Sequence, residues 1–137
     1  MIDALTQVSW LAVALATVAA TVVAGVYFGA LVPQAYQRVL GRAGQPAPAA
    51  TPVTAIGPVV CILATVVASA VLVAALDLTT ATDAVVFALV VGVGYLVAMT
   101  FQIAINPNMP HPLRYGLLNA PFFLVTSLTT SLILVLV

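Results

Sequence analysis

The stretch Val8–Leu31 reads VSWLAVALATVAATVVAGVYFGAL, and its 24 residues include no charged side chain. About 20 apolar residues in a helix are enough to cross the hydrocarbon core of a bilayer, which is about 30 Å thick. Unpaired backbone groups are costly in lipid, so a run of this kind has to form a helix there. The stretch therefore predicts a membrane-spanning helix near the start of the chain.

Three further runs have the same character, and they extend over Val53–Leu76, Ala84–Ile105 and Tyr115–Val137. The 137-residue chain has only three basic and three acidic residues, and all six lie outside the four runs. A soluble domain of this size would need far more charge on its surface. The sequence predicts an all-α, integral membrane four-helix bundle made of two transmembrane hairpins, forming a single domain over residues 1–137.

The segments between the runs have the composition of loops. Loop one, roughly Pro33–Pro52, contains the low-complexity stretch GRAGQPAPAATP, which is typical of extended or mobile chain. Loop two is the short DLTTATD of Asp77–Asp83, where we expect Thr82 or Asp83 to cap the third helix. Loop three, Asn106–Pro112, has three prolines in seven residues, which stop the helix and stiffen the turn.

The basic residues predict the orientation. Loop one carries Arg38 and Arg42, and Arg114 follows loop three. The charged residues of loop two, Asp77 and Asp83, are both acidic. The positive-inside rule then places loops 33–52 and 106–114 in the cytoplasm and both termini outside. The N-terminus has no positively charged region before its apolar run, so we expect the first helix to remain rather than be removed as a signal peptide.

Small residues recur along one side of the first helix, at every fourth position and then in a GxxxG spacing. Such stripes let helix backbones approach closely, and packing drives association in lipid. The stripe indicates helix packing, either between subunits or, more simply, within the four-helix unit. Its members are Ala12, Ala16, Ala20, Ala24, Gly25 and Gly29.

A short amphipathic helix is predicted directly after the first span. It begins at Pro33, a residue that favours the first helical position, and ends near Gly41. Tyr36 lies on its apolar face, and Arg38 and Arg42 lie largely opposite. The arginines are candidates for contact with lipid phosphates, or they simply extend from the helix exit toward water.

These features resemble a family of small bacterial membrane proteins catalogued as domain of unknown function 1761. The similar pattern is a glycine, paired aromatics, another aromatic and a glycine after a basic exit, and it continues with a glycine-bearing third helix and small and polar residues where the fourth opens. The resemblance implies a compact four-helix unit in the bacterial inner membrane and no particular activity. The residues that carry it are Gly25, Tyr27, Phe28, Tyr36, Gly41, Gly92, Gly94 and Leu117–Asn119.

A weak internal repeat links the two hairpins. Val23–Tyr27 reads VAGVY and Val91–Tyr95 reads VGVGY, each in the first helix of a hairpin that leads to a basic loop. Duplication of a two-helix unit and chance both explain the match, because valine and glycine are common here.

Polar residues in the second half suggest a ligand site. Gln102 and Asn106 share a helix face. Three further polar residues, His111, Arg114 and Asn119, follow closely in sequence. We expect the five either to surround a lipid headgroup or small polar ligand, or to serve structure, with interhelical hydrogen bonds from Gln102 and Asn119 and a helix cap from Asn106. With the two loop-one arginines, the candidate ligand residues are Arg38, Arg42, Gln102, Asn106, His111, Arg114 and Asn119.

Several kinds of chemistry are poorly supported. Cys61 is the only cysteine and His111 the only histidine, so we expect no disulfide, metal site, cofactor or catalytic residue. Zero net charge argues against nucleic acid as a partner. No run contains Asp, Glu, Lys, Arg or His, whereas proton-coupled transporters such as the small multidrug exporters need an ionisable group of this kind at depth.

The expected function is therefore that of a non-enzymatic accessory subunit or self-associating scaffold with lipid contacts. Its expected partners are membrane lipids and either further copies of itself or a larger membrane protein complex. The alternative is a transporter of small solutes or lipids, working as an oligomer with an uncharged path along Thr126–Ser131. A membrane enzyme or thiol-redox protein fits least well.

Overall fold

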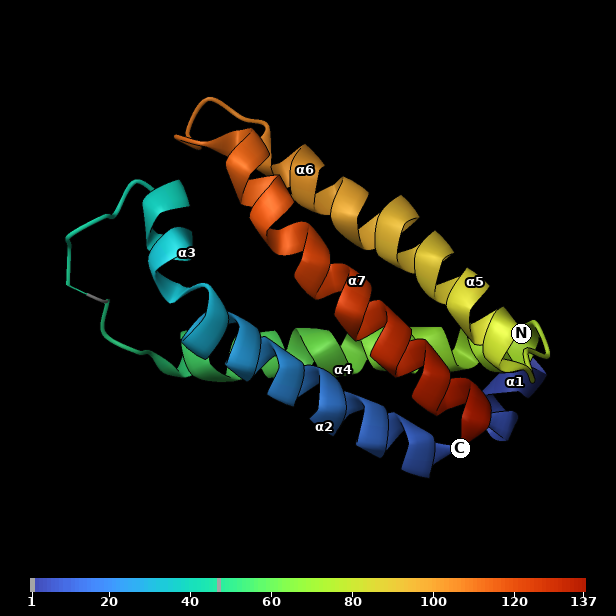
Figure 1. Ribbon diagram of the computed structural model, residues 1–137. Coiled ribbons are helices and arrows are strands. Elements are labelled where there is room, and N and C mark those ends of the chain that lie inside the picture. Colours follow the sequence, from blue (N-terminus) through green and yellow to red (C-terminus); the bar gives the residue numbers. More distant parts are fainter. Residues whose placement is uncertain (1, 47) are drawn as a thin grey trace.

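The computed structural model describes residues 2–46 and 48–137, and within these ranges the side chains from residue 4 onward. Met1 and Ala47, the latter in the predicted loop one, lie outside the described residues, as does the side chain of Asp3. The described elements are all helical (Figure 1). In chain order they are α1 (Ile2–Gln7), α2 (Trp10–Val26), the π-helical η1 (Tyr27–Leu31), α3 (Pro33–Val39), α4 (Pro52–Ala75), α5 (Ala81–Val91), the π-helical η2 (Gly92–Val97), α6 (Ala98–Ala104) and α7 (Pro112–Leu136).

Among the described residues, four stretches of helix are long and apolar enough to cross a membrane. They are Trp10–Leu31, Pro52–Ala75, Ala81–Ala104 and Pro112–Leu136. The predicted four-helix membrane fold is confirmed, and so is the short amphipathic helix after the first span, which is α3. On α3, Val39 is buried and Arg38 is exposed.

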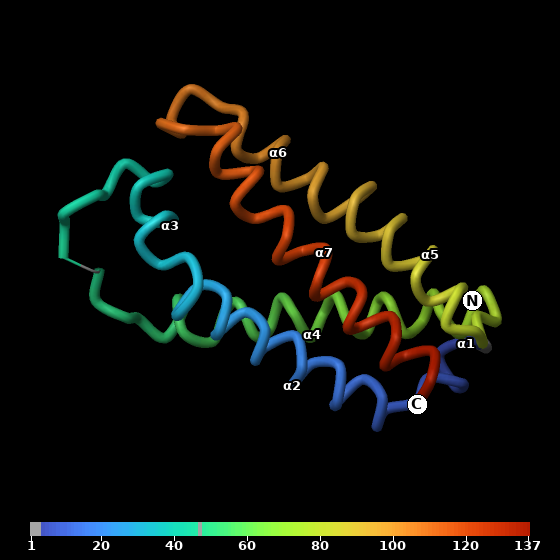
Figure 2. The backbone as a smooth tube through the Cα atoms, viewed as in Figure 1, coloured from blue at the N-terminus to red at the C-terminus, as the bar shows by residue number. Residues whose placement is uncertain are grey.

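The last span, α7, is the centre of the bundle. It packs against α2 on one side and against α5, η2 and α6 on the other, with smaller contacts to α3 and α4. The backbone trace in Figure 2 shows α7 running between α2 and the α5–α6 span. Helix α4 packs mainly on α2, α1 and α7, and its first half is exposed.

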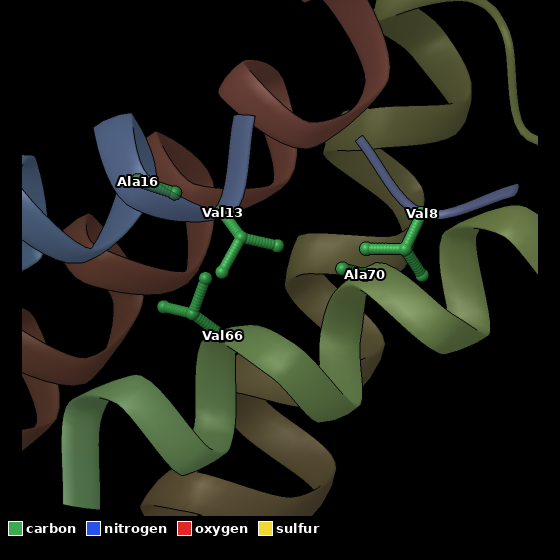
Figure 3. Packing of buried hydrophobic residues seen from close by; sticks show 5 residues of the cluster. All are labelled: Val8, Val13, Ala16, Val66 and Ala70. Carbon is green, nitrogen blue, oxygen red and sulfur yellow. The ribbon is translucent and has the colours of Figure 1, made fainter. Parts of the chain in front are cut away.

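A core cluster of buried apolar side chains lies where α2 meets the second half of α4. Val13 of α2 and Val66 of α4 point toward one another, and Ala16 lies on the same side of α2 (Figure 3). Val66 is 1% exposed and Ala16 is fully buried. Val8, which follows α1, packs beside Ala70 and ties the N-terminal segment to α4.

The two basic loops lie at one end of the bundle, and both termini lie at the other (Figure 1). Gly41, which ends the α3 segment, approaches loop three so closely that an added Cβ would lie 3.2 Å from Cγ of Pro110. Gly41 has a φ of +70°, a conformation that glycine adopts without strain. The location of both basic loops at one end of the bundle and both termini at the other agrees with the two hairpins predicted from the sequence.

The helix starts are set by caps that differ in part from the prediction. The third span is capped by Thr80, not by Thr82 or Asp83. Asp83 is instead the third residue of the helix, where its carboxylate accepts hydrogen bonds from the Thr80 backbone N–H at 3.0 Å and the Thr80 hydroxyl at 2.7 Å. This reciprocal capping box satisfies donors that a helix start leaves free, so the helix begins earlier than the apolar run.

The two π-helical segments lie at or directly after the stretches of the internal repeat. Tyr27, which ends VAGVY, begins η1, and the VGVGY stretch overlaps η2. π-Helical turns are rare and locally widen a helix. In the register of the repeat, η1 begins at the last position and η2 at the second, so the two π-helical segments correspond only in part.

Asp77 ends α4 in an unfavourable conformation. Its φ is +52°, and the backbone N–H groups of Asp77 and Leu78 donate to the carbonyls of Ala74 and Val73 at 3.4 and 3.2 Å. These bonds form a Schellman motif, in which the position of Asp77 is usually glycine. An aspartate there adopts a left-handed backbone and places its negative charge at the negative end of the helix dipole.

Replacing Asp77 by glycine is therefore expected to raise the free energy of unfolding by about 1 kcal/mol. Denaturant unfolding in detergent micelles measures this change. Asp83→Gly is the matched control: it removes the carboxylate from the capping box and is expected to lower stability. A loss of stability in Asp77→Gly would mean that the carboxylate makes a contact that outweighs its backbone cost.

Candidate functional site

A cleft lined by hydroxyl groups lies between α4 and the third span, with α7 as its floor. Its cavity volume is about 70 Å³. Apolar side chains of α2, α4, α5, η2 and α7 complete the lining, and among the lining residues none is charged. We call this feature the hydroxyl cleft, and its hydroxyl-bearing residues are Thr65, Ser69, Thr126, Ser127, Thr130 and Ser131.

Three of these hydroxyls have protein partners. Thr65 and Thr126 donate back to their own helices, to the carbonyls of Cys61 at 3.0 Å and Phe122 at 2.8 Å. Ser127 donates across to the carbonyl of Ala88 on α5, at 2.9 Å. The bonds that Thr65 and Thr126 make to their own helices are how serine and threonine are normally accommodated in apolar helices.

The other three hydroxyls, those of Ser69, Thr130 and Ser131, behave differently. These residues are 6%, 6% and 2% exposed, so all are more than nine-tenths buried. Within the described part of the chain, no hydrogen bond is formed by any of the three side chains. No described side-chain oxygen is both sealed from its surroundings and without a partner, so these three hydroxyl oxygens keep some accessible surface, and all three residues line the cleft.

An aromatic cluster supports the cleft from the side of the basic loops. Phe28 contacts Tyr36 of α3 and Phe122 of α7, with ring centroids 5.2 and 4.9 Å apart. The hydroxyl of Tyr27 donates to the carbonyl of Leu118 at 2.7 Å and thereby links η1 to α7. Burial, followed by the neighbouring Tyr115 hydroxyl, raises the pKa of Tyr36 well above its ordinary value.

A second cavity lies beside α3 and brings together the two arginines of loop one. Its volume is about 450 Å³, and the lining residues include no acidic side chain. Arg38 is exposed and Arg42 is half-buried. This arrangement, at the membrane-interface end of the first span, suits an anionic group such as a lipid phosphate. The lining residues are Phe28, Pro33, Gln34, Tyr36, Gln37, Arg38, Arg42, Ala43, Gly44 and Gln45.

Of the five polar residues of the second half, two line a cavity together. His111 and Arg114 line a shallow cavity with Pro110, Pro112 and Leu113. Gln102, Asn106 and Asn119 are not among the residues that line this cavity.

Asn119 is buried in the bundle and donates to the carbonyl of Tyr115 in its own helix at 2.8 Å, not across to another helix. Gln102 is exposed on α6, and within the described residues it makes no interhelical hydrogen bond. Asn106 donates to the carbonyl of Ile103 at 2.7 Å and so closes the end of α6, as the structural alternative predicted.

The stripe of small residues is divided between two environments. Ala12, Ala16 and Ala20 are buried inside the bundle, and Ala24 is half-buried. Gly25 and Gly29 are exposed, and a Cβ added to either would meet nothing within 4 Å. The alanines thus serve packing within the chain, while the glycine pair leaves an open smooth surface.

The sequence pointed to four of the six hydroxyl-bearing residues of the hydroxyl cleft. The run Thr126–Ser131 was a candidate polar path, but Thr65 and Ser69 of α4 were missed. Their spacing of four residues, which places them on one helix face, was the available signal. No group of three or more His, Cys, Asp or Glu able to hold a metal ion occurs among residues 2–46 and 48–137.

Among the described residues, three apolar spans packed around a fourth, α7, define this chain as a multi-pass helical membrane protein. More specifically, it belongs to the family described as Protein of unknown function (DUF1761), whose family model matches residues 11–135. The resemblance noted in the sequence is thereby confirmed. Comparisons with curated proteins and with solved structures find no match.

Proposed function

We propose that this protein is a non-enzymatic membrane subunit or self-associating scaffold that packs against another membrane chain through the face of α2 and η1 bearing Gly25 and Gly29. The observation that supports it most is that this glycine pair is uncovered in the single chain. In lipid, association depends on close packing, and small residues permit it. Three alanines of the same helix already pack in this way inside the bundle.

The exposed first half of α4 supports the same proposal. Val53, Ile56 and Val60 are 79%, 61% and 56% exposed, although they belong to a span whose second half is packed. The protein's own bundle therefore covers only part of α4. A neighbouring chain and bound lipids would complete its surroundings.

We also infer the setting. The protein lies in the bacterial inner membrane, with loops 33–52 and 106–114 in the cytoplasm and both termini outside. The support is the location of Arg38, Arg42 and Arg114 at one end of the bundle, combined with the positive-inside rule. The cavity that contains Arg38 and Arg42 then faces the phosphates of the inner leaflet.

Native mass spectrometry of protein extracted gently from its own membrane tests the subunit proposal. We expect the protein to emerge at a fixed ratio with a further copy or another membrane protein. The double variant Gly25→Leu with Gly29→Leu is expected to emerge alone, because the leucines would prevent close approach. Val86→Leu, on an exposed position of α5, is the control and should retain the partner. If the wild-type protein emerges alone, the proposal fails.

Transport of a small solute or lipid by an oligomer is the second candidate function. The hydroxyl cleft favours it, because an uncharged polar surface lies within the spans. The cleft of a single chain is short, and its lining includes no residue of the arginine-bearing end. A path across the membrane would therefore need surfaces that neighbouring chains supply.

A further inference from the structure

We propose that the hydroxyl cleft binds an apolar molecule that carries an uncharged hydroxyl or carbonyl group, such as a long-chain or isoprenoid alcohol. The polar group of the ligand would bond to Ser69, Thr130 and Ser131, and its apolar part would lie against the rest of the lining. This inference concerns a binding site in the single chain and is independent of the subunit proposal.

The three unpartnered hydroxyls determine the chemistry of the bound group. Each hydroxyl both donates and accepts, so either an alcohol or a carbonyl oxygen satisfies it. A polar group in an apolar environment costs free energy unless it is hydrogen-bonded, and lipid tails offer no partner. Thr126 of the same helix bonds back to a carbonyl, whereas the hydroxyls of Thr130 and Ser131, which also line the cleft, form no such bond.

The lining also excludes a charged headgroup. The cleft residues are uncharged, and an ionised group without a counter-charge is strongly disfavoured in a medium of low dielectric constant. Fatty acids and phospholipid headgroups therefore do not fit. An uncharged group suits the cleft because the hydroxyls can satisfy it completely.

Size and access point to the same class of ligand. About 70 Å³ accommodates a hydroxyl or carbonyl group with a few carbon atoms, but not a whole lipid. Thr65 lines the cleft and is also exposed on α4, so the cleft opens at the surface of that helix. In the bilayer this surface meets lipid tails, and a ligand can enter sideways from the membrane. Ile62 and Leu96 then flank its apolar part.

Photolabelling in phosphatidylcholine vesicles tests the proposal. The probe is 1-hexadecanol with a diazirine in its chain, and hexadecane with the same diazirine is the matched apolar probe. Mass spectrometry would locate the label. We expect the alcohol to label the segments around residues 62–69 and 122–131 at least about fivefold more than the alkane does. One hydrogen bond of about 1 kcal/mol gives a factor of this size.

The variant Ser69→Ala, Thr130→Val, Ser131→Ala is expected to remove this preference. Thr129→Val is the matched control, because the Thr129 hydroxyl donates to the carbonyl of Val125 at 2.8 Å and Thr129 does not line the cleft. The control variant should keep the preference for the alcohol.

Two results would overturn the proposal. Equal labelling of the wild-type protein by both probes would mean that water satisfies the three hydroxyls, for which the cleft has room. A triple variant that folds normally and still prefers the alcohol would place the binding site elsewhere. The comparison of the two probes on the wild-type protein decides the matter even if the triple variant does not fold.

Discussion

Replacing Gly116 by alanine is expected to lower the free energy of unfolding by about 1–3 kcal/mol, the usual cost of overpacking a closely fitted interior. Gly116 lies in α7 directly under the ring of Phe101 on α6. An added Cβ would lie 2.6 Å from Cζ of that ring and closer still to two other ring carbons. Either the ring has to rotate or the two helices have to separate. Denaturant unfolding in detergent micelles measures the loss.

Gly94→Ala is the matched control for this prediction. Nothing lies within 4 Å of a Cβ added at Gly94, and alanine is the better helix former, so stability should be unchanged or slightly higher. Phe101→Leu in the Gly116→Ala background should restore part of the stability, because the two residues are in direct contact. A Gly116→Ala protein as stable as the wild type would show that the Phe101 ring moves aside at no cost.

The second large effect is expected at the seam between α2 and α4. Ala16 is fully buried in the cluster that contains Val13 and Val66. Leucine at this position would add three carbon atoms to a filled space and force α2 away from α4. We expect Ala16→Leu to cost about 3 kcal/mol, at the upper end of typical overpacking. Unfolding in micelles and the mobility of the folded protein on size exclusion would both register the change.

Ala14→Leu separates packing from hydrophobicity in this experiment. Ala14 is exposed on the same helix, and a leucine there would contact only lipid or detergent. Since lipid tails are as apolar as leucine, we expect little change. Equal losses in both variants would indicate that a general property of α2, rather than its fit against α4, controls stability.

The four spans could be predicted because each depends only on local composition. Val8–Leu31 was predicted, and Trp10–Leu31 is observed. The largest shifts are at the starts of the third and fourth spans, which begin three residues earlier than predicted, at Ala81 and Pro112. Polar capping residues and a proline at the first helical position extend a helix beyond its apolar run, and these signals were present in the sequence.

The packing could not be predicted in the same way. Every span is apolar on all sides, so the sequence does not distinguish faces that meet lipid from faces that meet protein. Ala16 and Gly29 belong to one predicted stripe, yet Ala16 is buried and Gly29 is open. The hydroxyl cleft depends on how α4 and α7 are placed against each other, a relation between residues about 60 positions apart that no local pattern encodes. The short α1 was also missed, because six residues form no span.

The central position of α7 has a consequence for biosynthesis. The ribosome delivers α2, α4 and the α5–α6 span to the membrane before α7 exists, yet α7 holds α2 and the third span together. Until it arrives, the carbonyl of Ala88 lacks the Ser127 hydroxyl, and Tyr27 lacks the Leu118 carbonyl. Before α7 arrives, α2 and α4 can already pack on each other, whereas the α5–α6 span lacks its main partner. The protein acquires its final shape, including the hydroxyl cleft, in a late step that begins when α7 leaves the translocon.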